Sequence, residues 1–123
     1  MVSNPDQWID DMASAGVDRL TFHLESSPDC LSTAENVKNK GMKVGVALKP
    51  ETPVERIIPY CHELDLVLIM TVEPGFGGQP FMEDQLDKVR FLRQKFPLLN
   101  IEVDGGINVE TAGKATEAGA NLI

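Results

Sequence analysis

Basic residues are scarce in this sequence of 123 residues. Lysine and arginine together number 11, whereas aspartate and glutamate number 19, so the formal net charge is -8. Proteins that bind nucleic acid or anionic membranes do so through clustered lysine and arginine side chains. The charge balance therefore argues against both classes of partner. Any anionic ligand must instead be held by local groups, against the field of the whole chain.

Long apolar runs and cysteines are also few. The longest strongly apolar run, residues 66–70, is far shorter than a membrane-spanning helix, and residues 1–6 lack the basic and apolar regions of a secretory signal. Cys30 and Cys61 have no metal-type spacing, and without a secretory signal they are expected to be reduced, buried thiols. These absences predict a cytoplasmic protein with neither a membrane span nor a disulfide.

The composition is typical of a folded globular protein. Hydrophobic residues make up 42% and charged residues 24% of the chain, which is close to the average for globular domains and far from the signature of disorder. A chain of this length can bury a substantial core. We therefore expect a single domain over residues 1–123.

Short apolar segments recur along the chain. Each has the length of a strand and follows a segment with helical features, so the order is helix then strand, five times over. This rhythm is typical of βα units, in which consecutive strands run parallel. The predicted strands are residues 20–24, 44–48, 66–70, 101–103 and 121–123.

Prolines and capping residues delimit the predicted helices. Pro5 suits the first position of an opening helix. Residues 52–55 form a capping-box pattern, but Pro59 interrupts the helix that it would start, so this helix is expected to be short or irregular. The last helix runs from Asn108, a good cap, to Gly119.

Two architectures share this order of elements. One is an open, doubly wound sheet of five strands, and the other is a section of an eight-stranded (β/α)8 barrel. The pattern alone does not choose between them. Because the sequence opens on a helix and ends within an apolar strand, it reads as cut at both ends, which weakens the open-sheet interpretation.

A glycine-rich segment, residues 71–79, follows an apolar strand and precedes a helix. Its three glycines, Gly75, Gly77 and Gly78, allow positive φ angles and bring backbone N–H groups close to a ligand. Such segments bind phosphate through backbone N–H groups and helix starts. The alternative is a glycine-rich turn that binds nothing.

A second segment, residues 101–108, places an acidic residue at the end of a strand. Asp104 is followed by Gly105 and Gly106 before the next helix. In both architectures the carboxyl ends of the strands form the ligand face. Asp104 is therefore a candidate for proton transfer or metal ligation. The alternative is a turn aspartate that hydrogen-bonds to the local backbone.

These two segments also resemble a known family. Residues 70–81 and 102–107 are similar, in order and spacing, to the signature pair of the ribulose-5-phosphate 3-epimerase family. Residues 22–25, 45–50 and 117–121 extend the resemblance over nearly the whole chain. Lys49 and Glu73 follow the animal-type form of these motifs rather than the bacterial form.

The resemblance implies a fold and an activity. It implies an α/β protein, a parallel (β/α)8 TIM barrel of which this chain covers about strands four to eight, and a homodimer or other oligomer. The implied reaction interconverts D-ribulose 5-phosphate and D-xylulose 5-phosphate in the pentose phosphate pathway. Two aspartates exchange the proton at C3, and a divalent metal ion (zinc, iron, manganese or cobalt) assists.

The resemblance also assigns roles to residues by position. Asp104 corresponds to a catalytic aspartate that is also a metal ligand. The substrate-binding positions are Gly75, Phe76, Gly77 and Gly78 of the phosphate loop, together with Asp104, Gly105 and Gly106. Met70 corresponds to a methionine beside the reacting carbons, although a core role is the simpler interpretation.

Several functional positions of the family have no counterpart in this sequence. The family's first three strands carry the partner aspartate and two metal-binding histidines, and His23 and His62 do not replace them, so both are interpreted as structural. We therefore expect the chain alone to be inactive as an epimerase. The alternative function is that of a non-catalytic, truncated relative that binds phosphorylated ligands or a partner chain.

Overall fold

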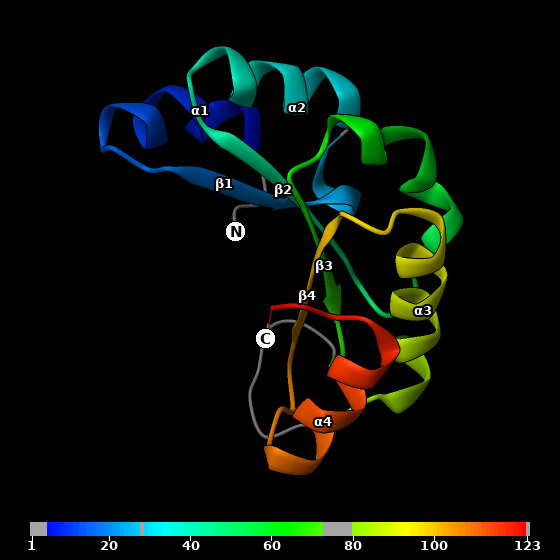
Figure 1. The fold of residues 1–123 in the computed structure, drawn as a ribbon. Coiled ribbons are helices and arrows are strands. Elements are labelled where there is room, and N and C mark those ends of the chain that lie inside the picture. Colours follow the sequence, from blue (N-terminus) through cyan, green and yellow to red (C-terminus); the bar gives the residue numbers. More distant parts are fainter. Residues whose placement is uncertain (1–4, 28, 73–79, 123) are drawn as a thin grey trace.

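The computed structural model describes residues 5–27, 29–72 and 80–122 (Figure 1). Its centre is a parallel sheet of four strands in the order β1-β2-β3-β4. The strands are β1 (Arg19–His23), β2 (Lys43–Leu48), β3 (Leu66–Met70) and β4 (Asn100–Asp104). Because each strand lies beside the next in the sequence, the described sheet has no reversal of strand order, in contrast to a doubly wound sheet. This order is that of a barrel section.

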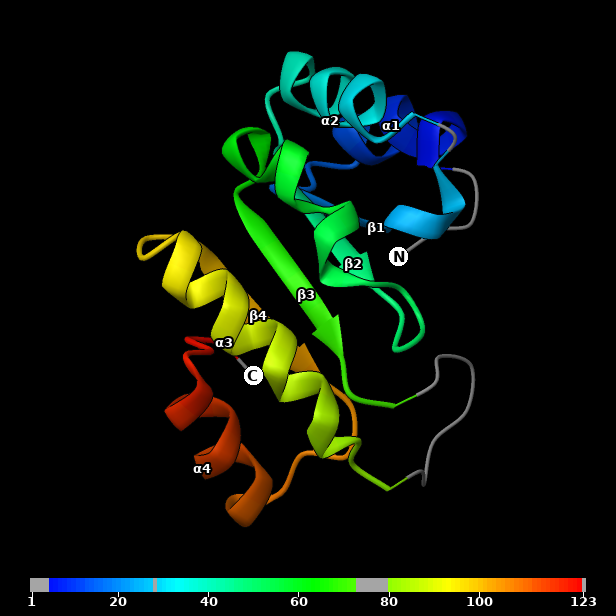
Figure 2. The same cartoon turned by 90° about the vertical axis from the view of Figure 1, so that its right-hand side faces the viewer.

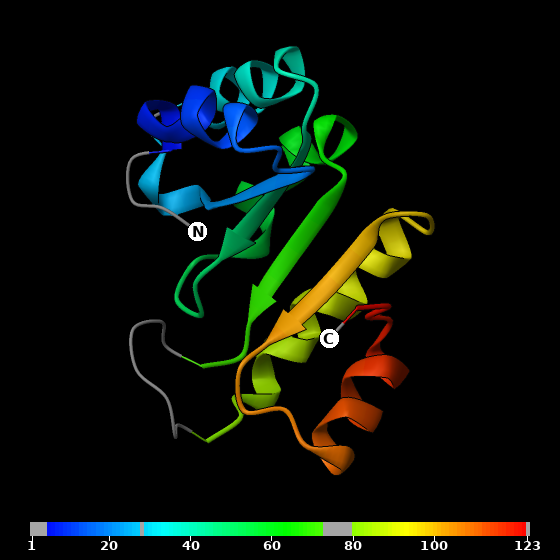
Figure 3. The ribbon, with the colours of Figure 1, turned by 90° about the vertical axis from the view of Figure 1, so that its left-hand side faces the viewer.

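Helices connect the strands and cover one face of the sheet. Figure 2 looks onto α3 with β3 and β4 behind it, and Figure 3, from the opposite side, has these strands in front. The α-helices are α1 (Pro5–Ser14), α2 (Cys30–Asn39), α3 (Leu86–Lys95) and α4 (Val109–Ala118), and the short 3-10 helices are η1 (Leu24–Ser26), η2 (Val54–Arg56), η3 (Ile58–Glu63) and η4 (Glu83–Gln85). No helix in the described ranges is long and apolar enough to cross a membrane.

The alternation of side chains along the strands divides the core in two. Phe22, Val46, Val67 and Ile101 are paired neighbours across the sheet, and all are buried in the main core that the helices share. The intervening positions point to the other face, where the buried residues Ala47, Leu66, Leu68 and Met70 form a smaller cluster with Leu122. Every residue of β3 is buried, as its continuous apolar run predicts.

An ion pair spans the face of the sheet that none of the described helices covers, which we call the bare face. Arg19 Nη2 of β1 lies 4.0 Å from Glu102 Oε1 of β4, although β2 and β3 separate these strands. In a flat sheet three strand spacings amount to about 14 Å. Contact between side chains of the two outer strands therefore fits a sheet that curves around its bare face, as a barrel wall does.

The predicted capping box at residues 52–55 is wrong, whereas the predicted irregular helix is confirmed. The chain forms η2 and η3 in place of an α-helix, with Pro59 inside η3. The Thr52 hydroxyl does not cap a helix, because it donates a hydrogen bond to Glu25. A contact between residues distant in the sequence thus replaces the local one.

The fifth predicted strand, residues 121–123, is reduced to a single parallel bridge between Leu122 and Glu102. The Asn121 side chain is one reason, because its Oδ1 accepts the Ile101 N–H at 2.7 Å in place of a backbone carbonyl. Ile123 lies outside the described residues. Within those residues the sheet has four strands and a bridge, not five strands.

Both cysteines are free and buried, as predicted. Burial raises the pKa of each thiol to about 11, with a nearby Asp29 adding to the effect at Cys30 and Cys30 adding to it at Cys61. At neutral pH both thiols are therefore protonated. They behave as small apolar side chains of the core.

Gly45 of β2 is closely packed on the bare face, between its paired neighbours Thr21 of β1 and Leu66 of β3. A Cβ atom added there would lie 2.6 Å from Thr21 Oγ1 and 3.2 Å from Leu66 Cδ2. We expect Gly45→Ala to lower the free energy of unfolding by about 1–3 kcal/mol, because buried neighbours must move. Gly113→Ala is the control, since nothing lies within 4 Å of an added Cβ there. It should raise stability by up to about 1 kcal/mol through helix propensity. Urea denaturation measures both, and equal effects would contradict this packing.

Candidate active site

The carboxyl ends of the strands lie at one edge of the sheet. The arrowheads of β2, β3 and β4 point to the same side in Figure 3. Met70, which ends β3, is paired with Asp104, which ends β4, and Leu48 at the end of β2 is paired with Ile69. In parallel α/β proteins this edge is where ligands bind. The predicted site residues that the structure describes are found there.

Asp104 is an exposed residue whose backbone is held firmly. It lies on the bare face, because its partner Met70 belongs to the small cluster there. Its carbonyl oxygen accepts the Thr71 N–H at 2.9 Å and the Thr71 hydroxyl at 3.0 Å. No hydrogen bond or ion pair engages its carboxylate among the residues that the structure describes. That arrangement differs from a turn aspartate bound to local backbone.

Gly105 and Gly106 both adopt backbone conformations that favour glycine. Their φ angles are +117° and +69°, a region that side chains with a Cβ rarely enter. A Cβ on Gly105 would collide with Val72, and one on Gly106 would lie 2.9 Å from the Cα of Phe81. The tight fit explains why glycine occupies both positions.

Val72 and Phe81 flank the segment that carries the predicted phosphate loop. Gly75, Phe76, Gly77 and Gly78 themselves lie outside the described residues. The structure nevertheless brings both ends of this segment against Gly105 and Gly106. Both ends of the first glycine-rich segment therefore lie beside the glycines of the second. That these segments bind phosphate stays a prediction.

Thr71 is a residue of this site that sequence reasoning did not single out. It is fully buried, and its hydroxyl donates to the carbonyl oxygens of Asp104 and Gly105. A hydroxyl residue directly after an apolar strand is the only local signal, and such residues are common at strand ends. The contact joins residues 33 positions apart, so the sequence pattern alone does not reveal it.

Glu25 and Lys88 hold the loop after β2 from two sides. The Glu25 carboxylate accepts the Lys49 N–H at 3.1 Å and the Thr52 hydroxyl. The Lys88 ammonium, from α3, donates to the carbonyl oxygens of Pro50 at 2.8 Å and Lys49 at 3.3 Å. Burial lowers the pKa of Lys88, and nearby carboxylates, Glu25 first among them, oppose that shift. The loop is thus fixed by charged groups from two different elements.

His23 lies at the end of β1, beside Glu25. Its Nδ1 is 3.7 Å from Glu25 Oε1, and neither of these buried atoms has a hydrogen-bond partner among the described residues. Burial lowers the pKa of His23, Glu25 raises it, and Lys49 lowers it further. The net direction is downward, so His23 is neutral at pH 7. His62, by contrast, has a side chain that is 68% exposed.

The described residues do not form a complete metal centre. They contain no group of three or more histidine, cysteine, aspartate or glutamate side chains placed to hold one ion. Asp104 offers a single carboxylate, whereas a catalytic metal site needs several protein ligands in fixed geometry. The metal-binding role of Asp104 stays a prediction.

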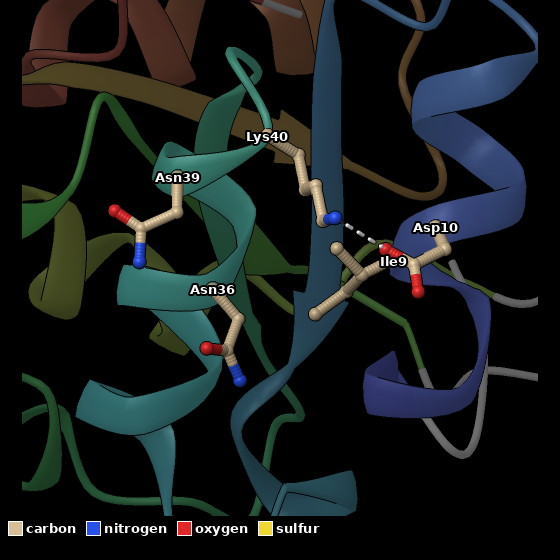
Figure 4. A pocket seen from close by; sticks show the side chains of 5 residues that line it. All are labelled: Ile9, Asp10, Asn36, Asn39 and Lys40. Atoms are coloured by element: carbon tan, nitrogen blue, oxygen red, sulfur yellow. Dashed lines mark ion pairs between the residues drawn. The ribbon is translucent and has the colours of Figure 1, made fainter.

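A surface pocket lies elsewhere, in the helix layer. It has a volume of about 360 Å³ and is lined by Ile9, Asp10, Asn36, Asn39 and Lys40 (Figure 4). Lys40 Nζ and Asp10 Oδ1 are 2.9 Å apart there, but both side chains are at least half exposed. Such surface ion pairs contribute little to binding or stability. The pocket lies away from the carboxyl ends of the strands. Its exposed ion pair gives no reason to place the active site there.

Comparison with known proteins decides the family. The model of the ribulose-phosphate 3-epimerase family matches residues 1–123. The chain belongs to this family. The four parallel strands and alternating helices of the described residues are accordingly part of the (β/α)8 barrel of these epimerases, which rules out the open-sheet alternative.

Several relatives match the whole chain. It is 51% identical over 123 residues to the ribulose-phosphate 3-epimerases of Candida glabrata and Schizosaccharomyces pombe, covering 100% of this chain and 50% and 54% of theirs. It is 49% identical over 127 residues to the cytoplasmic isoform of Oryza sativa, covering 56% of that protein. The chain spans about half the length of the curated relatives it matches.

The lowered pKa of His23 predicts a pH-dependent stability. In the unfolded chain the His23 side chain has the ordinary histidine pKa of about 6.5. In the folded chain its pKa is lower, so the folded chain binds this proton less readily. The free energy of unfolding should therefore keep its full value above that pH and fall as the pH drops below it. His23→Gln should flatten the decline between pH 7 and pH 5, measured by urea denaturation. His62→Gln is the matched control and should leave it unchanged; the opposite result would refute the buried, neutral state of His23.

Proposed function

We propose that this chain is part of a D-ribulose-5-phosphate 3-epimerase in which Asp104 transfers a proton at C3 of the sugar. One observation carries this assignment in a chain of the epimerase family. Asp104 has an exposed carboxylate at the carboxyl end of β4, and its backbone is fixed by the buried Thr71. A proton carrier needs both access to the substrate and a fixed position.

The chemistry of epimerisation explains why a carboxylate suits this place. Inversion at C3, beside the C2 carbonyl, removes the proton from one face of the carbon and forms an enediolate. A proton then returns to the other face. We assign Asp104 to one face of the carbon, and we propose that a second aspartate, which the family resemblance implies on an earlier strand of the barrel, acts on the other face. A single carboxylate can exchange the proton but cannot invert the carbon.

The phosphate of the substrate is assigned to the glycine-rich segments. We propose that Gly75, Phe76, Gly77 and Gly78 hold it together with Gly105 and Gly106. The positive φ angles of Gly105 and Gly106 support this assignment, because successive N–H groups in such conformations form concave anion sites. An anion held by backbone groups also suits a chain with a net charge of -8.

The remaining properties of the enzyme are proposed on the resemblance. A divalent metal ion would take Asp104 as one ligand and require further ligands beyond the described residues. The assembly is proposed to be a homodimer or other oligomer. The proposed compartment is the cytoplasm, which the name of the rice relative, a cytoplasmic isoform, supports.

Proton exchange tests the role of Asp104 directly. In D₂O the protein should replace the C3 hydrogen of ribulose 5-phosphate or xylulose 5-phosphate by deuterium, because exchange needs only one proton carrier. We expect Asp104→Asn to slow this exchange roughly 100-fold or more, since the amide cannot accept the proton. Proton NMR of the recovered sugar measures the rate.

The matched control for this test is Asp65→Asn. Asp65 flanks β3 at the opposite, amino end, where its carboxylate accepts the Val44 N–H at 2.8 Å. An asparagine preserves that acceptor, so exchange should continue at the unchanged rate. If neither sugar exchanges with the unchanged protein, or if Asp104→Asn exchanges normally, the proposed role fails.

A further inference from the structure

Lys49 lies immediately after β2, at the ligand edge of the sheet. Leu48 is paired with Ile69, and both are buried on the helix-covered face. Side chains alternate along a strand, so the next position belongs to the bare face. It continues the row formed there by the paired residues Met70 and Asp104. Lys49 thus occupies the same edge and the same face as the proposed proton carrier.

The charge of Lys49 also acts on a residue of the bare face. Lys49 is one of the groups that lower the pKa of His23, after the larger effects of burial and Glu25. His23 is paired with Ala47, a member of the bare-face cluster. This electrostatic effect agrees with the face that strand alternation assigns to Lys49.

The Lys49 backbone is held more firmly than its side chain. Its N–H donates to Glu25, and its carbonyl oxygen accepts from Lys88. No hydrogen bond or ion pair engages the Lys49 ammonium in the part of the chain that the structure describes. Half-buried and without an acidic partner there, this cation is available to an anion.

Because the chain is negatively charged overall, a local cation such as the Lys49 ammonium is important for binding an anion. With a net charge of -8, the overall field repels an anionic ligand, and an attractive charge must be local. A lysine ammonium binds phosphate as a point charge through up to three donors. Lys49 supplies such a charge one strand away from the β3 end, where the glycine-rich segment begins.

We propose that Lys49 is an additional binding residue for the phosphate of the sugar substrate, held in position by Glu25 and Lys88. The proposal rests on the proposed function, because it takes the pentose phosphate as the ligand. It adds a side-chain cation to a site otherwise assigned to backbone N–H groups. Glu25 and Lys88 act as positioning residues, since they contact the Lys49 backbone and not the ligand.

Ligand binding by matched variants tests this role. The dissociation constant of ribulose 5-phosphate is measured by calorimetry for the unchanged protein, Lys49→Met, Lys49→Arg and Lys43→Met. Lys43 begins β2 at the opposite end of the same strand and is exposed, so it controls for the loss of one positive charge. We expect Lys49→Met to bind about tenfold more weakly. Lys49→Arg should stay within about threefold, and Lys43→Met should be unchanged.

The outcomes separate the two proposals. If the unchanged protein binds ribulose 5-phosphate and Lys49→Met binds it equally well, the role of Lys49 is refuted and the proposed function stands. If Lys43→Met weakens binding of ribulose 5-phosphate as much as Lys49→Met does, the loss of affinity comes from the change in net charge. That result would also refute the role of Lys49. If the unchanged protein does not bind the sugar phosphate, both proposals fail for this chain. Circular dichroism checks that each variant is folded, and Lys49→Arg preserves the test if Lys49→Met is not.

Discussion

The hydrogen bonds from Thr71 to the carbonyl oxygen of Asp104 fix the relative position of β3 and β4. They extend a parallel register in which Met70 lies beside Asp104. Because side chains alternate between the two faces of a strand, a slip by one residue would turn Asp104 toward the helix-covered core. The exposure of its carboxylate, and with it the proposed chemistry, depends on this register.

The same register organises the charges around the site. On the bare face, Arg19 and Glu102 pair across the sheet below the ligand edge. At the edge itself, Glu25 and Lys88 are engaged with the backbone of the loop after β2. These four charged groups are thus committed to structural contacts. The exposed carboxylate of Asp104 and the ammonium of Lys49 remain free of such contacts within the described residues.

The sequence predicted the elements whose signals are local. The apolar run at residues 66–70 became a fully buried strand, and Asn108 caps α4 as expected, in a capping box with Thr111. Features that depend on distant partners were missed. Thr52 bonds to Glu25 instead of capping a helix, and Thr71 joins two strand ends. The sequence pattern made Asp104 a candidate, and the family resemblance predicted roles for Asp104, Gly105 and Gly106, but neither gave a reason for their geometry.

Chemical-shift mapping by ¹H–¹⁵N NMR tests the central claim, that ligands bind at the carboxyl ends of the strands. Titration with ribulose 5-phosphate should shift the amide signals of Lys49, Asp104, Gly105 and Gly106. The signals of Lys43, Asp65 and Asn100, at the amino ends, should stay in place. The largest shifts at the amino ends, or at the helix-layer pocket around Lys40, would contradict the account.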